Sequence, residues 1–243
     1  MSEPSRRCRH VSAIVLAGGT GTRLKSVVSD RPKVLAEFHG RPFIAYILDA
    51  LRDAGVPRAV ISTGFMASMV RDTLGASHGP MELVYAHESS PLGTGGAIRL
   101  ALPFTAGDTV LAMNGDSLCD VDFEALVADH ETSGAAATLT LTRVEDSARF
   151  GTVVLGEDRA IARFEEKRPD GGPAWINAGI YALSRRFIES IAEDIPVSIE
   201  RDVMPAWVGR GLRGFEGGRH FIDIGVPEDH ARTAEFLASR ARR

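Results

Sequence analysis

The chain has 243 residues, of which 44% are hydrophobic and 25% are charged, the composition of an ordinary globular protein. Its net charge of −4 at pH 7 argues against nucleic acid or an anionic membrane as a partner, so any phosphate-binding charge must be local. The two cysteines, Cys8 and Cys119, lack CxxC spacing, which argues against a zinc site and a disulfide framework and makes a reducing cytoplasm the expected compartment.

The first ten residues are polar and carry a basic cluster at Arg6, Arg7 and Arg9. Chain ends of this kind are usually poorly ordered, so we expect a flexible arm over residues 1–10. The apolar run that follows has only about seven residues before the first glycine, far fewer than a membrane span needs.

The first expected strand, residues 13–17, leads into a glycine-rich loop with the chemistry of a phosphate site. The strand is short, apolar and β-branched, as buried strands are. Glycines let backbone amides approach an anion closely, and such a turn at the end of a strand forms a nest of N–H donors. Two cations, Arg23 and Lys33, follow closely enough to converge on the same ligand. The strand end and the loop comprise Leu16, Ala17, Gly18, Gly19, Thr20, Gly21 and Thr22.

The spacing of these glycines fits neither of two common nucleotide motifs. The Walker A pattern GxxxxGK[ST] is absent, and the dinucleotide pattern GxGxxG fails because Leu24 stands at its third glycine. The glycines alone are therefore also consistent with a plain strand-to-helix turn beside a surface arginine. Arg23 and Lys33 together favour a triphosphate site.

After this loop, strands and helices alternate to about residue 142. The patterns predict helices over residues 43–54, 66–74, 93–102 and 122–132, and strands over residues 58–63, 81–86, 108–113 and 136–142. The alternation is typical of βαβ units and predicts an α/β fold with a Rossmann-like, doubly wound and mostly parallel central sheet. Ligands of such sheets bind beyond the carboxyl ends of the strands, where the glycine loop, residues 88–94 and residues 114–116 all fall.

From about residue 143 the pattern becomes that of a smaller, mixed sheet. Strands are expected over residues 151–155, 161–165, 176–183, 212–215 and 220–222, and helices over residues 198–208 and 228–240. No Pro/Ser-rich linker separates the two parts. We therefore expect one domain over residues 11–243, with halves at about residues 11–142 and 143–243.

Two aspartates are the candidates for a metal site. Asp116 follows Asn114 and Gly115 at the end of an expected strand, where a carboxylate can bind a hard cation such as Mg²⁺, although Asn-Gly-Asp is also ordinary turn chemistry. Asp223 stands between isoleucines inside an expected strand, where burying an unpaired charge would be costly. A Mg²⁺ ion shared with Asp116 would supply the missing partner.

The stretch LAGGTGTRL, residues 16–24, followed by RPKVL, residues 31–35, resembles the signature of the sugar-1-phosphate nucleotidylyltransferases, or NDP-sugar pyrophosphorylases. The resemblance runs through nearly the whole chain and is closest to the heptose-1-phosphate guanylyltransferase-like group. It implies a nucleotide-diphospho-sugar transferase fold, with the glycine loop and Lys33 at the nucleotide. It also implies that Asp116 and Asp223 are the family's two Mg²⁺-binding aspartates, in its GD and F-x-D-I-G motifs.

In the second half, the resemblance implies a pocket for the sugar 1-phosphate. Glu166 and Lys167 look like the family's E-K-P element, with Arg168 inserted before the proline. In relatives the lysine holds the phosphate and the glutamate bonds sugar hydroxyls. From the residues alone, this charged run also fits a solvated hairpin. The other sugar-pocket residues implied in the same way are Gly151, Asn177 and Gly179.

The segment ESSPLGT, residues 88–94, resembles the family's base-recognition loop. Relatives that transfer uridylyl or thymidylyl groups place a glutamine where Glu88 stands. A carboxylate only accepts hydrogen bonds, whereas guanine offers N1–H and an exocyclic amine, so GTP is the expected donor. The nucleotide-binding residues of this loop and of the next strand end are then Glu88, Pro91, Gly93, Thr94, Asn114 and Gly115.

The resemblance implies that a sugar 1-phosphate attacks the α-phosphorus of a nucleoside triphosphate and releases pyrophosphate, with Arg23, Lys33, Asp116 and Lys167 as catalytic residues and Mg²⁺ as cofactor. The expected sugar substrate is D-glycero-α-D-manno-heptose 1-phosphate, and mannose 1-phosphate or another hexose 1-phosphate is the alternative. A non-catalytic nucleotide-sugar-binding regulatory subunit is the alternative from a different class. The resemblance also implies a homo-oligomer, with a dimer favoured.

Overall fold

A central sheet of eleven strands organises the part of the chain that the computed structural model describes, residues 8–19, 30–167 and 169–240. The strands are β1 (Ser12–Ala17), β4 (Arg58–Thr63), β5 (Ser77–His78), β6 (Met81–His87), β7 (Thr109–Asn114), β8 (Ser117–Asp120), β9 (Ala137–Val144), β10 (Thr152–Leu155), β11 (Ile161–Glu165), β12 (Ala174–Ser184) and β13 (Leu212–Asp223). The strands β2 (Glu37–Phe38) and β3 (Arg41–Pro42) form a separate ribbon. The helices are α1 (Phe43–Asp53), α2 (Ala67–Leu74), α3 (Gly93–Ala101), α4 (Phe123–Ser133), α5 (Arg185–Glu189) and α6 (Pro227–Arg240).

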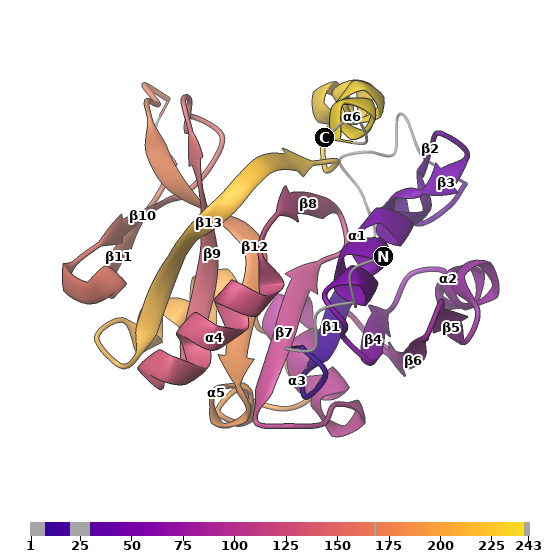
Figure 1. The fold of residues 1–243 in the computed structure, drawn as a ribbon, viewed down its shortest axis with the longest axis horizontal. Helices are drawn as coiled ribbons and strands as arrows, with labels where there is room; N and C mark the ends of the chain where they lie inside the picture. The colour runs from indigo at the N-terminus through magenta and orange to yellow at the C-terminus, as the bar shows by residue number, and fades with distance from the viewer. Residues whose placement is uncertain (1–7, 20–29, 168, 241–243) are drawn as a thin grey trace, which may run out of the picture.

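Four of the five strands predicted in the first half form the parallel part of the sheet, whereas the fifth, β9, lies beyond β12 and is antiparallel to it. The order across the sheet is β5–β6–β4–β1–β7–β12–β9–β13–β8, and β10 joins it to β11 alongside β12 (Figure 1). Strands β6, β4, β1 and β7 pair in parallel, which confirms the predicted doubly wound α/β fold. Because β4 and β7 lie on opposite sides of β1, the winding reverses between β1 and β7. Ligands of doubly wound sheets bind at such a reversal.

The second half adds the mixed part of the sheet and pairs with three strands of the first half, with both β12 and β13 lying against β9. Strand β12 pairs with β7, and the end of β13 pairs with β8. The strands predicted over residues 212–215 and 220–222 are one long strand, β13, whose register shifts between Phe215 and Gly218 and again before Ile222. The pair Gly217-Gly218 would usually mark a turn. Here Gly218 lets β13 approach β9 closely, since a side chain at Gly218 would lie 2.7 Å from the carbonyl oxygen of Leu141.

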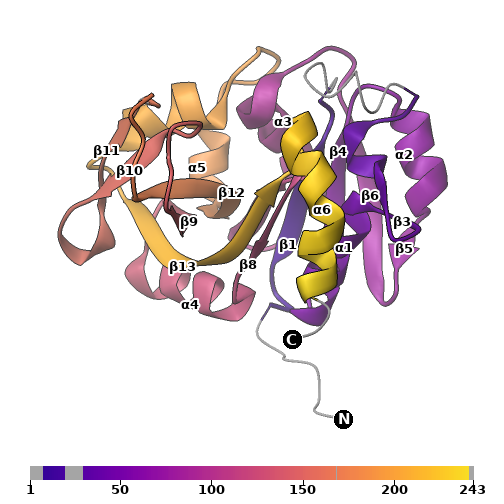
Figure 2. The same ribbon diagram turned by 90° about the horizontal axis from the view of Figure 1, so that it is seen from above.

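Helices cover both faces of the sheet, with α1 and α4 on one side and α3 and α5 on the other (Figure 2). Alternation along β1 sends Ala13 and Val15 to the first face and Ile14 to the second. Each face has its own buried apolar cluster, so the strands of the parallel part are apolar on both sides.

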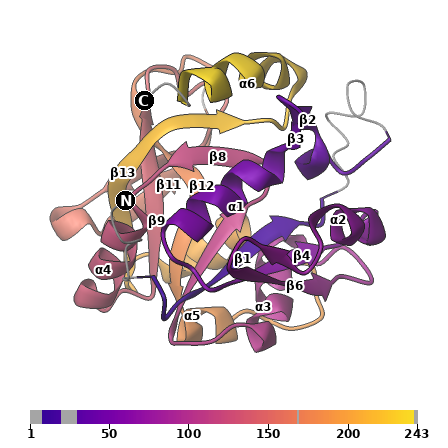
Figure 3. The same cartoon turned by 45° about the vertical axis from the view of Figure 1, so that its right-hand side comes forward.

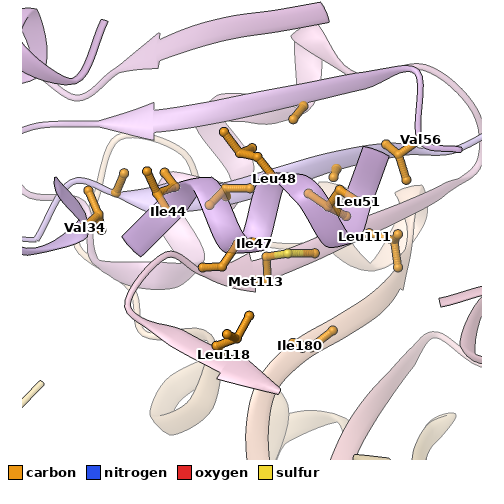
Figure 4. Close-up of a cluster of buried hydrophobic side chains, with 14 of the residues drawn as sticks. Val34, Ile44, Ile47, Leu48, Leu51, Val56, Leu111, Met113, Leu118 and Ile180 are labelled. Atoms are coloured by element: carbon orange, nitrogen blue, oxygen red, sulfur yellow. The ribbon is translucent and has the colours of Figure 1, made fainter. Parts of the chain in front are cut away.

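Helix α1 buries one apolar face against the sheet, as its spacing predicts. Ile44, Ile47, Leu48 and Leu51 are buried and pack with residues such as Met113 (Figure 4). Each such side chain contributes about 1.5–3 kcal/mol when fully buried. This packing fixes the strand ends that carry the site residues.

Helix α6 lies above the end of β13 and reaches the β2–β3 ribbon (Figure 3). The ring of His230 lies 4.8 Å from that of Phe38, and the ring nitrogen Nε2 of His39 is 2.8 Å from the carbonyl oxygen of Ala234. Burial lowers the pKa of His230. No helix within the described ranges is both long and apolar enough to cross a bilayer.

Three sequence predictions need correction. The expected helix over residues 198–208 is a π-helical turn, Ile199–Val203, followed by a 3-10 turn, Met204–Trp207, because Pro205 cannot donate a backbone hydrogen bond there. The helix expected over residues 93–102 ends at Ala101, and a 3-10 turn, Leu102–Phe104, follows it. The flexible arm expected over residues 1–10 does not extend to Cys8, which is fully buried in the core, and residues 1–7 lie outside the described part.

Candidate active site

A cavity of about 400 Å³ lies at the carboxyl ends of β1 and β7. Ten of its lining residues are predicted nucleotide-binding positions, and an eleventh is the predicted metal ligand Asp116. Two apolar residues, Val34 and Ala97, were missed because nothing in their chemistry distinguishes them from core positions. Gly21, Thr22 and Arg23 lie outside the described residues. The lining comprises Leu16, Ala17, Gly18, Gly19, Lys33, Val34, Glu88, Pro91, Gly93, Thr94, Ala97, Asn114 and Asp116.

A cation and a carboxylate meet in the wall of this cavity. Lys33, in the 3-10 turn Lys33–Leu35, forms an ion pair with Oδ2 of Asp116, 83 residues away in the chain. The Lys33 side chain is 18% exposed and that of Asp116 is 21% exposed, so both are accessible from the cavity. Ser117 Oγ lies 3.3 Å from the other oxygen of Asp116. The structure therefore brings together two of the four predicted catalytic residues.

Glycines let the segments of this cavity approach closely. The amide of Gly115 donates to the carbonyl oxygen of Leu16 over 2.9 Å, and a side chain at Gly115 would lie 2.5 Å from that oxygen. Gly179 has φ +71° and lies against Asn114, where an added Cβ would be 2.5 Å from the side-chain amide nitrogen. These positions require glycine because any side chain would push the cavity wall apart.

Glu88 organises the loop that enters α3. Its Oε1 accepts a hydrogen bond from the hydroxyl of Ser62 over 3.2 Å, and its Oε2 accepts one from the amide of Leu92 over 3.0 Å. A side chain at Gly18 would lie 2.4 Å from Oε1 of Glu88, which shows how closely the glycine loop and this loop approach. Ser62 was not predicted, since a serine inside a strand carries no distinctive signal.

Asp223 is the last residue of β13, and its backbone lies beside that of Asp116 and Ser117 at the start of β8. Ser117 is paired with Asp223, and the amide of Ile224 donates to the carbonyl oxygen of Asp116 over 2.9 Å. The Asp223 carboxylate accepts from the amide of Gly225 over 2.7 Å and lines a second cavity, of about 550 Å³, while Asp116 lines the first. The expectation that Asp223 is buried is wrong, because the strand ends there and leaves the residue half-buried.

The two aspartates fit a metal that takes few protein ligands. Among the described residues, no group of three or more His, Cys, Asp and Glu side chains could hold a metal ion. Mg²⁺ commonly binds one or two carboxylates and completes its shell with substrate phosphates and water. Asp116 and Asp223 are hard oxygen donors of this kind at neighbouring strand ends, but they line different cavities.

The predicted sugar-pocket residues do not share a single cavity. Glu166 lines a third cavity, of about 520 Å³, with Arg163 and Glu200 among its other residues. Gly151 is exposed beside it, next to the Thr152–Glu165 pair of the β10–β11 hairpin. Lys167 is exposed just beyond β11, and Arg168 lies outside the described residues.

Asn177 and Gly179 are held within a hydrogen-bonded turn of β12. The Asn177 side chain donates to the hydroxyl of Tyr181 over 2.8 Å and accepts from the amide of Gly179 over 2.9 Å. Tyr181 is fully buried, and burial raises the pKa of its hydroxyl well above the ordinary value. Burial also raises the pKa of Cys119 to about 12, so this thiol stays protonated at neutral pH.

The fold and the cavity are those of an enzyme family that handles nucleotides. Residues 12–237 match the nucleotidyl transferase family, and the chain belongs to that family. It is 34% identical to the D-glycero-alpha-D-manno-heptose 1-phosphate guanylyltransferase of Aneurinibacillus thermoaerophilus, in a match that covers 93% of this chain and 98% of that protein. The mannose-1-phosphate guanylyltransferase of Mycobacterium tuberculosis is also 34% identical, but the match covers 93% of this chain and 64% of that protein.

A solved structure agrees with these sequence matches. HddC from Yersinia pseudotuberculosis superposes with a TM-score of 0.83 at 32% identity, over 93% of this chain and 99% of that chain. Its complex with GMP-PN superposes with a TM-score of 0.80 at 31% identity, with the same coverage. The likeness therefore extends over nearly the entire length of both chains.

Proposed function

We propose that the chain is a guanylyltransferase that condenses GTP with D-glycero-α-D-manno-heptose 1-phosphate to give a GDP-sugar and pyrophosphate. The observation that supports this most strongly is the Lys33–Asp116 pair in a cavity lined by ten of the residues predicted to bind nucleotide. The choice of substrates is supported by the heptose-1-phosphate guanylyltransferase whose match covers nearly the whole of this chain and of its own length.

The reaction is an in-line transfer of a nucleotidyl group. An oxygen of the sugar 1-phosphate bonds to the α-phosphorus of GTP, while the bond from that phosphorus to the bridging oxygen breaks and pyrophosphate leaves. The nucleophile is already an anion at neutral pH, so no general base is needed. The obstacle is the mutual repulsion of two polyanions, and catalysis consists of positioning and electrostatic stabilisation.

Three cations of the chain carry out this stabilisation. Lys33 lines the cavity and would stabilise charge at the α-phosphate. Arg23 would clamp the β- and γ-phosphates through its planar guanidinium, a role that rests on the sequence pattern alone. Lys167, exposed just beyond β11, would fix the phosphate of the sugar substrate.

Asp116 and Asp223 would hold the divalent metal that the family generally uses, and we propose that it is Mg²⁺. When bound, the ion would neutralise phosphate charge and help to orient the two substrates. The adjacency of the two strand ends supports this assignment. Lys33 restrains the Asp116 carboxylate, and the amide of Gly225 restrains that of Asp223.

The preference for guanine is proposed to depend on Glu88 and the loop it orders. Its carboxylate oxygens accept from Ser62 and Leu92 and retain lone pairs for further donors, such as the N1–H and exocyclic amine of guanine. The complex of HddC with GMP-PN supports a guanine nucleotide at this fold. Measuring turnover with GTP, ATP, UTP, CTP and dTTP tests the proposal, and a clear preference for UTP or dTTP would refute it.

One assay distinguishes the sugar substrates and the non-catalytic alternative. Pyrophosphate release is measured with GTP, magnesium and a panel of sugar 1-phosphates, and the heptose 1-phosphate is expected to give the highest kcat/KM. The best rate with mannose 1-phosphate would favour the function of the mycobacterial relative. Nucleotide binding without turnover on any sugar phosphate would instead favour a regulatory subunit.

A further inference from the structure

Glu200 lies where a turn of the second half docks onto the first turn of α3. Its Oε2 accepts a hydrogen bond from the hydroxyl of Thr94 over 2.7 Å and one from the hydroxyl of Ser198 over 3.0 Å. The Thr94 hydroxyl in turn accepts from the amide of Ile199 over 2.9 Å, and the amide of Gly95 donates to the carbonyl oxygen of Val197 over 2.8 Å. The turn that carries Glu200 is therefore fixed to the wall of the nucleotide cavity.

The other oxygen of the same carboxylate faces the second half of the site. Oε1 of Glu200 accepts from the hydroxyl of Tyr181 over 3.3 Å. That hydroxyl accepts from the side-chain amide of Asn177 over 2.8 Å, and the Asn177 oxygen accepts from the amide of Gly179 over 2.9 Å. Because Tyr181 is fully buried, its hydroxyl depends on these protein partners rather than on water.

The hydrogen bonds form a continuous chain that runs from Thr94 through Glu200 to the turn at Asn177–Gly179. At one end Thr94 lines the nucleotide cavity, and at the other Gly179 lies against Asn114, which lines the same cavity from β7. Between them, Glu200 lines the third cavity together with Glu166, the residue expected to bond sugar hydroxyls. Glu200 is thus shared by both sides of the site.

We propose that Glu200 is a positioning residue that holds the nucleotide-side Thr94 and the sugar-side turn at Asn177–Gly179 in a fixed relation. The proposal rests on the proposed function, because it assumes that the two sides bind the two substrates. A carboxylate only accepts hydrogen bonds, so one Glu can gather donors from both sides at once. Fixed placement matters because a misplacement of about 1 Å can cost about a hundredfold in rate.

The test uses steady-state KM values for both substrates in three variants. Glu200→Ala removes the acceptor and should raise the KM for GTP and the KM for the sugar phosphate by about tenfold each, the scale of one net hydrogen bond. Tyr181→Phe keeps the buried ring and breaks only the link to the Asn177–Gly179 turn, so it should raise the KM for the sugar phosphate more than the KM for GTP. Glu200→Gln keeps one acceptor oxygen and replaces the other by an NH2 donor, so it should lose one of the two links and lie between wild type and Glu200→Ala.

The matched control is Glu193→Gln. Glu193 also reaches α3, through an ion pair with Arg99, but it is largely exposed and outside the chain of hydrogen bonds. This control should leave both KM values unchanged. A lowered melting temperature with unchanged KM values in Glu200→Ala and Tyr181→Phe would overturn the proposal, as would a Glu200→Gln variant as impaired as Glu200→Ala.

Failure of this proposal is distinguishable from failure of the proposed function. Wild-type turnover with GTP and a sugar 1-phosphate tests the function alone. GTP binding measured by calorimetry on the same variants needs no turnover, and it should weaken more in Glu200→Ala than in Tyr181→Phe. Equal GTP affinity in wild type and Glu200→Ala would contradict the positioning role even in a protein that turns over.

Discussion

Replacing Gly179 by alanine should damage the site through one neighbour, Asn114. Gly179 has φ +71°, a backbone conformation that costs an L-residue about 1–2 kcal/mol. The new Cβ would lie 2.5 Å from the Asn114 amide nitrogen, whereas ordinary contacts begin at 3.4 Å. Asn114 must therefore move by about 1 Å, and since it lines the nucleotide cavity, we expect kcat/KM to fall about 10- to 100-fold.

Gly134→Ala supplies the control, because it imposes the same backbone cost without a contact. Gly134 ends α4 with φ +63°, and nothing lies within 4 Å of an added Cβ. Gly134→Ala should lose about 1–2 kcal/mol of unfolding free energy in urea, Gly179→Ala should lose more because of the clash, and only Gly179→Ala should lose activity in a pyrophosphate-release assay. Equal activity in the two variants would refute the argument that Asn114 is displaced.

Three further predictions concern charge. Lys33→Ala or Asp116→Ala should lower kcat about 10²- to 10³-fold in the pyrophosphate assay, the scale for removing one electrostatic stabiliser, and near-wild-type rates would contradict the proposed site. Chelation of divalent metal should abolish turnover and added Mg²⁺ should restore it, whereas activity that persists after chelation would argue against the two-aspartate metal site. Burial lowers the pKa of His130 from 6.5 to about 4, so the unfolded chain binds more protons as the pH falls from about 6.5 towards about 4. The contribution of His130 to the free energy of unfolding is therefore complete above pH 6.5, and about 2 kcal/mol of it should be lost by pH 5. Urea unfolding at pH 7 and pH 5 should show a smaller loss of stability in His130→Gln than in the wild type. An equal loss in the two proteins would disprove the effect.

Local patterns predicted most of the fold because its main elements carry their own signals. Helix α1 shows its buried face in the spacing of Ile44, Ile47, Leu48 and Leu51, and the parallel strands are short apolar runs between turns. Strand β8 and the ribbon β2–β3 were missed because their two to four residues are too few to show periodicity. The long strand β13 was divided at its glycines, since only pairing with β9 and β8 reveals that they bend a strand rather than end it.

One cavity gathers most residues that the sequence singled out for the nucleotide, but the sequence did not predict their contacts with other segments. The Lys33–Asp116 pair agrees with the expectation that both belong to one site, although 83 residues separate them. Glu200 was missed because its importance lies in partners 19 and 106 residues away, Tyr181 and Thr94, which no local pattern connects. The half-buried position of Asp223 depends on where β13 ends, and its flanking isoleucines gave the wrong impression of full burial.

The strand pairings that join the halves have a consequence for how substrates come and go. Strand β12 of the second half is hydrogen-bonded to β7 of the first, and the end of β13 is hydrogen-bonded to β8, directly beyond Asp116. A hinge motion that separated the halves would have to rupture these strand pairings. Any movement that accompanies substrate exchange is therefore expected in the loops around the cavities and not between the halves.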